Sequence, residues 1–304
     1  MKQFRILTMI AIAAVLATFT ACDENTTDPV DTDPAVAAPT NLKAASADGA
    51  VFLSWVASVD ENADNFGSYN IVILNKSTNE TLAPRTVGKG IINVRIDGLT
   101  NGVRYQFTVR SVTDLGKEST NFALVEWSPA VRQNIDNTGV PIKVYATTST
   151  SFNSAVDLYN AQGRAEVISQ AGDIFRDRGD LYVFASNTTS SLDIISPNQA
   201  INTGPETHFS SSGPYDADNL DNLHADQPPA NASYTLQQLT IGTSTVSTGK
   251  VYFGRIVRGN DMYYFRMLIK RGSNGSLVQG SGNDRYVEMA VSFQNAPNNP
   301  FAKQ

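Results

Sequence analysis

Residues 99–109 read Leu-Thr-Asn-Gly-Val-Arg-Tyr-Gln-Phe-Thr-Val, and the second half of this stretch alternates apolar and polar side chains. Tyr105, Phe107 and Val109 therefore share one face of a predicted β-strand. Similar strand-like runs lie on both sides of it, at residues 51–55, 69–74, 91–96 and 122–127. Turn residues such as Asp97-Gly98 separate the runs. Short strands at this spacing predict a β-sandwich over residues 39–130.

The predicted sandwich also carries four local patterns in a fixed order. They are Pro39-x-x-Leu42, the strand with Trp55, the stretch from Leu99 to Tyr105, and Gly116-Lys117-Glu118-Ser119. In this order they resemble the landmarks of the fibronectin type III family. The resemblance implies a tyrosine corner, in which the Tyr105 hydroxyl is hydrogen-bonded to the backbone, and buried positions for Trp55 and Leu99. It also implies binding or spacing rather than catalysis, although a fold does not fix a function.

The composition is that of a globular protein of about two domains. The chain has 304 residues, of which 41% are hydrophobic and 17% charged. It holds 23 basic and 29 acidic residues, for a formal net charge of −6. Phosphate binding needs a basic surface, so this balance argues against a nucleic-acid partner.

The amino-terminal residues 1–21 have the pattern of a signal peptide. Lys2 and Arg5 precede an apolar stretch that runs from Ile6 to Phe19, and the only cysteine of the chain, Cys22, follows it. The apolar stretch is too short for a comfortable membrane span, which takes about 20 residues. A single cysteine also excludes an intramolecular disulfide, so stability must come from packing.

Phe19-Thr20-Ala21-Cys22 resembles the lipobox of bacterial lipoproteins, although Phe19 replaces the usual leucine. The resemblance implies that Cys22 is acylated and that the chain contacts a membrane through this anchor. The alternative is an ordinary signal peptide followed by an incidental cysteine. Asp23 and Glu24 resemble a surface-export signal of Bacteroidetes-type lipoproteins, whereas in enterobacterial lipoproteins an Asp here resembles an inner-membrane retention signal. We expect a lipid-anchored protein of the cell envelope, in the outer membrane and exposed at the surface.

Residues 22–38 read as the lipidated cysteine and a tether. This segment is rich in Asp, Thr and Pro and lacks apolar periodicity. Such a composition predicts an unfolded, extended chain that separates the first domain from the lipid.

Residues 140–304 predict a second all-β domain, either a β-sandwich or a barrel-like fold, without a family that we can assign. Its strongest runs are 251–257, 262–269 and 286–293, and Arg258-Gly259-Asn260-Asp261 predicts a hairpin turn between the first two. Apolar side chains on both faces of 262–269 predict a central strand. Arg266 interrupts one of these faces and needs a partner if it is buried, for which Glu288 is the candidate.

A long polar segment, residues 197–229, is predicted to be a loop with a short helix over 218–224. It contains the candidate metal ligands His208, His224, Asp216, Asp218 and Asp221. Carboxylate and imidazole groups suit zinc and similar ions. The two histidines also give a layout similar to that of haem-scavenging surface lipoproteins of Bacteroidetes. The competing interpretation is that these are solvated loop side chains, and on it we predict no cofactor.

The sequence favours a non-catalytic binding or adhesion module over an enzyme, because it contains no nucleophile elbow, phosphate loop or zinc-protease helix. We expect an extracellular protein or a glycan as partner. Three alternatives stay open: capture of a small ligand such as haem or a metal, an accessory role in glycan processing, and glycan hydrolysis. Hydrolysis requires two carboxyl groups at a set separation across a cleft.

Overall fold

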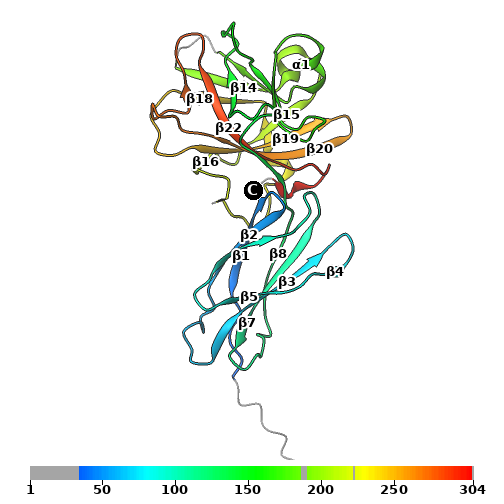
Figure 1. Cartoon of the computed structure of the whole chain (residues 1–304), viewed down its shortest axis with the longest axis vertical. Helices are drawn as coiled ribbons and strands as arrows, with labels where there is room; N and C mark the ends of the chain where they lie inside the picture. Colours follow the sequence, from blue (N-terminus) through cyan, green and yellow to red (C-terminus); the bar gives the residue numbers. More distant parts are fainter. Residues whose placement is uncertain (1–33, 186–189, 222, 303–304) are drawn as a thin grey trace, which may run out of the picture. The chain divides into compact units, whose positions relative to one another are not determined.

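The computed structural model describes residues 34–185, 190–221 and 223–302. The predicted signal peptide, Cys22 and the tether up to residue 33 lie outside the described residues. Residues from Ala35 onward form one compact unit, which contains two β-rich domains with separate cores (Figure 1). Among the described residues, no helix has the length and apolar character needed to cross a membrane.

The first domain is an antiparallel β-sandwich, as the sequence predicts. One sheet has the order β1-β2-β6 and the other the order β4-β3-β7-β8, with β5 paired to β3. The strands are β1 (Thr40–Ala47), β2 (Ala50–Val56), β3 (Phe66–Asn75), β4 (Glu80–Thr81), β5 (Arg85–Gly88), β6 (Asn93–Asp97), β7 (Tyr105–Thr113) and β8 (Ala123–Trp127). Trp55 is buried in the core between the sheets, as expected. The Thr100 amide donates to the Tyr105 hydroxyl at 3.1 Å, which confirms the predicted tyrosine corner.

The folded part of the chain begins before Pro39, within the segment expected to be a tether. Val36 is 5% exposed and belongs to the core of the first domain. The Ala37 amide donates to the Asp60 carboxylate at 2.7 Å, and the Ser58 hydroxyl donates to the Ala37 carbonyl at 2.6 Å. One apolar side chain and two hydrogen bonds therefore fasten these residues to the loop after β2.

The second domain consists of two open sheets. The larger has the order β10-β22-β20-β19-β15-β17, with β9, β16 and β21 paired beside this path, and the smaller has the order β12-β11-β13-β14-β18. The larger sheet comprises β9 (Val131–Gln133), β10 (Ile142–Tyr145), β15 (Glu206–Ser210), β16 (Tyr215–Asp216), β17 (Tyr234–Leu236), β19 (Lys250–Arg258), β20 (Asp261–Ile269), β21 (Val278–Gln279) and β22 (Tyr286–Phe293). The smaller comprises β11 (Ala155–Asp157), β12 (Glu166–Ile168), β13 (Leu181–Phe184), β14 (Ser191–Ile195) and β18 (Gln238–Gly242). The helices are α1 (Gly172–Arg178) and α2 (Pro197–Ile201), with two short 3-10 turns, η1 (Asn231–Ser233) and η2 (Pro300–Ala302).

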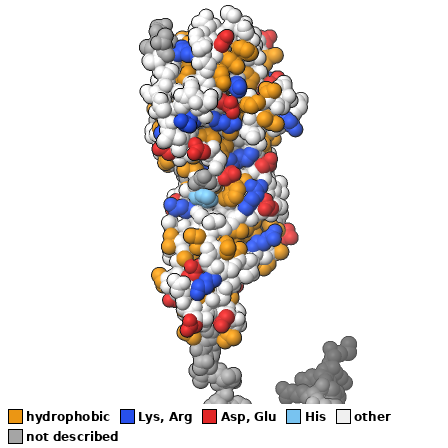
Figure 2. Space-filling view, turned by 60° about the vertical axis from the view of Figure 1, so that its left-hand side comes forward, with side chains coloured by type: hydrophobic (Ala, Val, Ile, Leu, Met, Phe, Trp, Pro, Cys, Tyr) orange, Lys and Arg blue, Asp and Glu red, His pale blue; other side chains and the backbone are white. Residues whose placement is uncertain are grey.

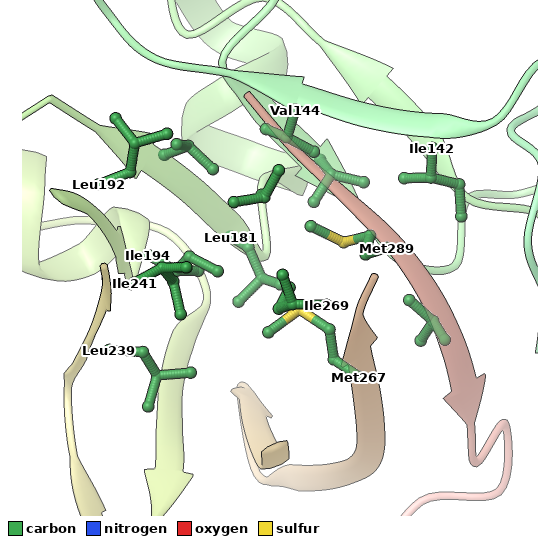
Figure 3. Packing of buried hydrophobic residues seen from close by; sticks show 14 of the residues in the cluster. Ile142, Val144, Leu181, Leu192, Ile194, Leu239, Ile241, Met267, Ile269 and Met289 are labelled. Carbon is green, nitrogen blue, oxygen red and sulfur yellow. The ribbon is translucent and has the colours of Figure 1, made fainter. Parts of the chain in front are cut away.

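The core of the second domain lies between its two sheets. Figure 3 shows Val144, Met267 and Met289 of the larger sheet facing side chains such as Leu181 and Ile194 of the smaller one. All five side chains are buried completely. Of the two folds that the sequence allows, the second domain is therefore the β-sandwich.

Two predictions for β20 are confirmed. The β19–β20 hairpin closes with Arg258 opposite Asp261, and Gly259 in the turn has a φ of +62°, which favours glycine. β20 lies between β19 and β22 and is buried on both faces.

The prediction of a long loop over residues 197–229 is wrong. The segment contains α2, β15 and β16, and β15 pairs with both β17 and β19. Thr207 and Phe209 of β15 are buried in the domain. This alternation is short and the surrounding residues are polar, so the sequence pattern does not predict a strand here. The predicted helix over 218–224 does not form in the part of it that the structure describes.

Candidate functional site

The three aspartates proposed as metal ligands each have a separate partner. Asp216 accepts from Lys250 at 2.6 Å, and this hydrogen bond holds the pKa of the Asp216 carboxyl below its usual value. Asp218 accepts from the Gly249 amide at 3.3 Å. Asp221 forms an ion pair with Arg132, a partly buried arginine in the contact between the two domains. The three carboxylates therefore bind separate partners on the protein itself.

The two histidines lie in different surroundings. His208 is on β15, where its Nε2 atom is 3.2 Å from a Glu206 carboxylate oxygen. His224 packs edge-on against Phe52 of the first domain, with ring centroids 6.5 Å apart. Within the described residues, no group of three or more His, Cys, Asp and Glu side chains could hold a metal ion. Among the residues that the structure describes, no such cluster therefore supports the metal hypothesis.

Ser46, near the end of β1, lies at the centre of the contact between the two domains. Its hydroxyl is 2.8 Å from the carbonyl oxygens of both Ser128 and Phe301, and it accepts from the Trp127 indole at 3.0 Å. The Phe301 ring packs edge-on against Trp127, with centroids 5.5 Å apart. A residue near the carboxyl end of the described chain therefore completes the core of the first domain.

Arg266 enters the same contact from β20, and the prediction that it pairs with Glu288 is wrong. Glu288 instead forms an ion pair with Lys270 at 3.0 Å. The Arg266 guanidinium, which is completely buried, donates to the carbonyl oxygens of Ser46 at 2.8 Å and Leu223 at 3.2 Å. Backbone carbonyls thus accept from the two terminal nitrogens of Arg266, whereas its buried Nε atom has no hydrogen-bond partner among the described residues.

Arg132 is the second arginine of this contact. It donates to the Ser46 carbonyl and forms an ion pair with Asp221 at 3.0 Å. Burial lowers the pKa of Arg132 to about 10. Burial, with the charge of Arg132 adding to it, also lowers the pKa of Arg266 well below the ordinary value. Two desolvated cations are thus held by carbonyls and by a single carboxylate.

A pair of carboxylates, the arrangement that a glycan hydrolase would need, lies beneath the β19–β20 hairpin. The Arg258 guanidinium is 2.6 and 2.7 Å from the two oxygens of Asp180, and 3.5 Å from Asp157. Burial, with the charge of Asp157 adding to it, raises the pKa of Asp180 to about 6. However, Asp157 is 2% exposed and Asp180 is fully buried, and Arg178 binds Asp157 at 3.0 Å. Carboxylates held in this way stabilise the fold and offer no access to a substrate.

An open pocket lies where β10 and β12 form the ends of their sheets. It has a volume of about 590 Å³, within the range of small-molecule sites. It is lined by Asp136, Thr138, Val140, Pro141, Lys143, Tyr145, Ser151, Phe152, Asn153 and Val167. The Tyr145 and Phe152 rings stack with centroids 4.2 Å apart and an interplanar angle of 16°. Phe152 is nevertheless 48% exposed, so this pocket presents an aromatic surface to solvent.

Polar groups surround these rings. The Lys143 amine lies 5.1 Å from the centroid of the Tyr286 ring, which itself is 4.9 Å from Tyr145. Burial raises the pKa of the Tyr145 hydroxyl. A phenol is already protonated at neutral pH, so this hydroxyl can donate a hydrogen bond. Aromatic faces beside a cation and a phenol can bind a ligand without covalent chemistry.

Sequence reasoning did not find this pocket, although one signal was present. In the stretch 142–145, Ile142 and Val144 point into the core, so Lys143 and Tyr145 must point outward. Phe152 contributes from the loop after β10, and its approach to Tyr145 depends on the three-dimensional course of that loop.

The surface elsewhere carries charges of both signs. Figure 2 shows acidic and basic side chains interspersed over one face of the molecule. This face therefore shows no basic stripe of the kind that nucleic-acid-binding proteins carry.

Comparison with known proteins identifies a fibronectin type III domain at residues 37–125. Three similar solved structures each cover 31% of this chain. One, described as a myokine structure, is 15% identical, with 99% of its chain covered and a TM-score of 0.26. The Clostridium perfringens spore cortex lytic enzyme SleM is 18% identical, with 28% covered and a TM-score of 0.25. A domain of human collagen XX is 19% identical, with 96% covered and a TM-score of 0.25. No curated protein matches the chain.

Proposed function

We propose that this chain, with a fibronectin type III domain at residues 37–125, is a lipid-anchored binding protein of the bacterial cell envelope. In this proposal the first domain holds the second one away from the membrane, and the second domain contacts the ligand. The observation that carries the proposal is the half-exposed Phe152 ring, stacked on Tyr145 in an open pocket. Exposed apolar groups with a polar rim are typical of binding surfaces.

The contact between the domains supports this division of roles. Ser46 of the first domain is hydrogen-bonded to Arg266 of the second, and both are fully buried. Relative motion of the domains would separate the buried cation from its acceptors, which is costly. The second domain is therefore presented in a fixed orientation on the first.

The leader supports the location. Lys2 and Arg5 precede an apolar stretch, and the only cysteine of the chain follows at position 22. The acidic residues Asp23 and Glu24 favour export to the cell surface. Acyl chains on Cys22 contribute about 0.8 kcal/mol for each buried methylene, so two or more chains give a stable attachment.

The test is protease treatment of intact host cells, combined with mass spectrometry of the mature amino terminus. We expect an acylated Cys22 and loss of the protein to external protease. A Cys22→Ser variant is the control and should leave the membrane fraction. An unmodified amino terminus, or full protection from protease in intact cells, would contradict the proposed location.

A further inference from the structure

We propose that the pocket between β10 and β12 binds an acidic oligosaccharide, with a sugar ring against Phe152 and a carboxylate or sulfate group beside Lys143. This inference names the ligand class of the pocket on which the proposed function rests. It does not depend on the lipid anchor, so the two can fail separately.

The aromatic stack provides the first half of the argument. Tyr145 covers one face of the Phe152 ring at a centroid distance of 4.2 Å, yet Phe152 remains 48% exposed. The face of an aromatic ring carries negative charge density, which attracts the weakly positive C–H groups that cover one side of a sugar ring. An exposed, pre-stacked ring is therefore ready to receive a sugar, with little side-chain entropy left to lose.

The polar groups of the pocket match the hydroxyl groups of a sugar. Ser151, Asn153 and Thr138 are exposed around the aromatic pair, and all three line the pocket. Hydroxyl and amide groups can both donate and accept hydrogen bonds, as sugar hydroxyls do. A purely apolar ligand would leave these groups unpaired against it.

The charge of the pocket determines the kind of sugar. Among the described residues, no carboxylate lies within ion-pair distance of the Lys143 amine, which is 5.1 Å from the centroid of the Tyr286 ring. The nearby carboxylates are already engaged. Asp136 accepts from Thr138, and Glu288, which is opposite Lys143 on β22, is bound to Lys270. Of the residues that the structure describes, Lys143 is the only cation that lines the pocket, and it forms no ion pair, so an acidic group on the ligand can bind it directly.

The dimensions of the pocket suit part of a longer chain. A volume of about 590 Å³ accommodates one or two sugar rings, and the pocket opens to solvent between two sheet edges. An extended polymer can therefore lie across the edge and place a single acidic unit over Phe152.

The experiment measures binding of the chain carrying Cys22→Ser, which keeps it free of lipid, to soluble polysaccharides by affinity electrophoresis. Alginate, polygalacturonate and chondroitin sulfate are the acidic probes, and dextran is the neutral one. We expect at least one acidic polymer to bind more tightly than dextran. Phe152→Ala should weaken that binding at least tenfold. Lys143→Met should weaken it at least fivefold and remove the preference over dextran.

Two matched variants serve as controls. Phe184→Ala removes an aromatic ring of similar exposure on β13 of the same domain, and Lys89→Met removes an exposed lysine of the first domain. Both should bind as the parent does, and the circular dichroism spectra of all four variants should match that of the parent at the temperature of the binding experiment.

The inference is overturned if none of the acidic polymers binds, or if Phe152→Ala and Lys143→Met both bind as tightly as the parent. Equal binding of dextran and the acidic polymers, unaffected by Lys143→Met, also overturns it. A protein that is found on the cell surface but fails these binding tests leaves the proposed location intact. If the protein passes the binding tests but is protected from external protease, the proposed binding site stands and the proposed surface location is rejected.

Discussion

The guanidinium of Arg266 donates a hydrogen bond of 2.8 Å to the carbonyl oxygen of Ser46, which lies 220 residues earlier in the chain. The hydroxyl of the same serine accepts from the Trp127 indole within the first domain. One buried residue therefore satisfies polar groups on both sides of the contact between domains. Since groups buried in this way tolerate little separation, the two domains should unfold together.

Arg266→Met should uncouple the domains. The change leaves the Leu223 carbonyl without its donor and weakens the hold on Ser46, so we expect a loss of about 2–3 kcal/mol in the free energy of unfolding. Both tryptophans, Trp55 and Trp127, belong to the first domain. In urea, tryptophan fluorescence and far-UV circular dichroism should give one shared transition for the parent and two separated transitions for the variant.

Arg164→Met is the matched control for that experiment, because Arg164 is exposed. It should leave the transitions coincident and the midpoint nearly unchanged. Coincident curves for Arg266→Met, at the midpoint of the parent, would show that the buried guanidinium does not couple the domains.

Ser46→Ala should destabilise the first domain directly. The Trp127 ring is fully buried, and its indole N–H would lose its acceptor. An unsatisfied buried donor costs about 1–3 kcal/mol, and urea denaturation followed by tryptophan fluorescence measures this loss. Ser281→Ala, at an exposed position, should change stability by less than about 0.5 kcal/mol. Equal stability of the two variants would rule out a role for the Ser46 hydroxyl.

The strands of both domains could be predicted from the sequence wherever the apolar pattern was clear. Residues 105–109 alternate apolar and polar side chains, and residues 262–269 carry apolar side chains on both faces. The partner of Arg266 could not be predicted, because it is a backbone carbonyl and every residue carries one. The pattern of charges in the sequence indicates only charged side chains as partners, and Glu288 on the run 286–293 is a candidate of that kind.

The candidate site was harder to predict than the fold. Lys143 and Tyr145 alternate with core residues on β10, so their outward direction could be inferred. The stacking of Phe152 on Tyr145 depends on how the loop between β10 and β11 turns back, which local periodicity does not encode. Conversely, the sequence indicates His208 and His224 as candidate ligands of one site, but in the fold they have different neighbours: Glu206 for His208 and Phe52 for His224.

Tyr105→Phe tests the predicted corner of the first domain. Tyr105 is 3% exposed, and its hydroxyl accepts from the Thr100 amide at 3.1 Å. Phenylalanine keeps the packing and removes the acceptor, so we expect a loss of about 1–2 kcal/mol. Thermal unfolding measures the change, with Tyr215→Phe in a partly exposed position as the control. A melting temperature equal to that of the control would contradict this assignment.

Asp180 should make stability depend on pH. Its pKa is raised to about 6 by burial and by the neighbouring Asp157, above the ordinary value of about 3.9. The folded state therefore retains a proton that the unfolded state releases between pH ~4 and ~6. The stability contributed by this proton is complete below pH ~4 and is lost as the pH rises through about 6.

Asp180→Asn isolates this effect, because asparagine stays neutral. The stability of the parent minus that of the variant should fall between pH 4 and 7, by on the order of 2–3 kcal/mol. Carboxyl groups far from this site titrate in both proteins and cancel in the difference, whereas the neighbouring Asp157 interacts with Asp180 and contributes to it. Urea denaturation across this pH range measures it, and a difference that stays constant would exclude a raised pKa for Asp180.

Arg258→Met should be the most destabilising of these changes. Arg258 lies 2.6 and 2.7 Å from the two oxygens of Asp180, and its loss leaves a fully buried carboxylate with no cation in contact. Removing one partner of a buried ion pair costs about 3–5 kcal/mol, and the cost at pH 7 should exceed that at pH 4.5, where Asp180 is protonated.

The double variant Arg258→Met with Asp180→Asn measures the interaction energy between these two side chains, apart from their contacts with other residues. With neither charge present, the penalty for an unpaired carboxylate disappears, so the double variant should be more stable than Arg258→Met alone. The two losses should therefore be strongly non-additive, with a coupling energy of about 1–3 kcal/mol in a double-mutant cycle at pH 7. Additive losses would mean that Arg258 acts through packing against Tyr263, whose ring centroid lies 5.8 Å from the guanidinium carbon, instead of through the charge of Asp180.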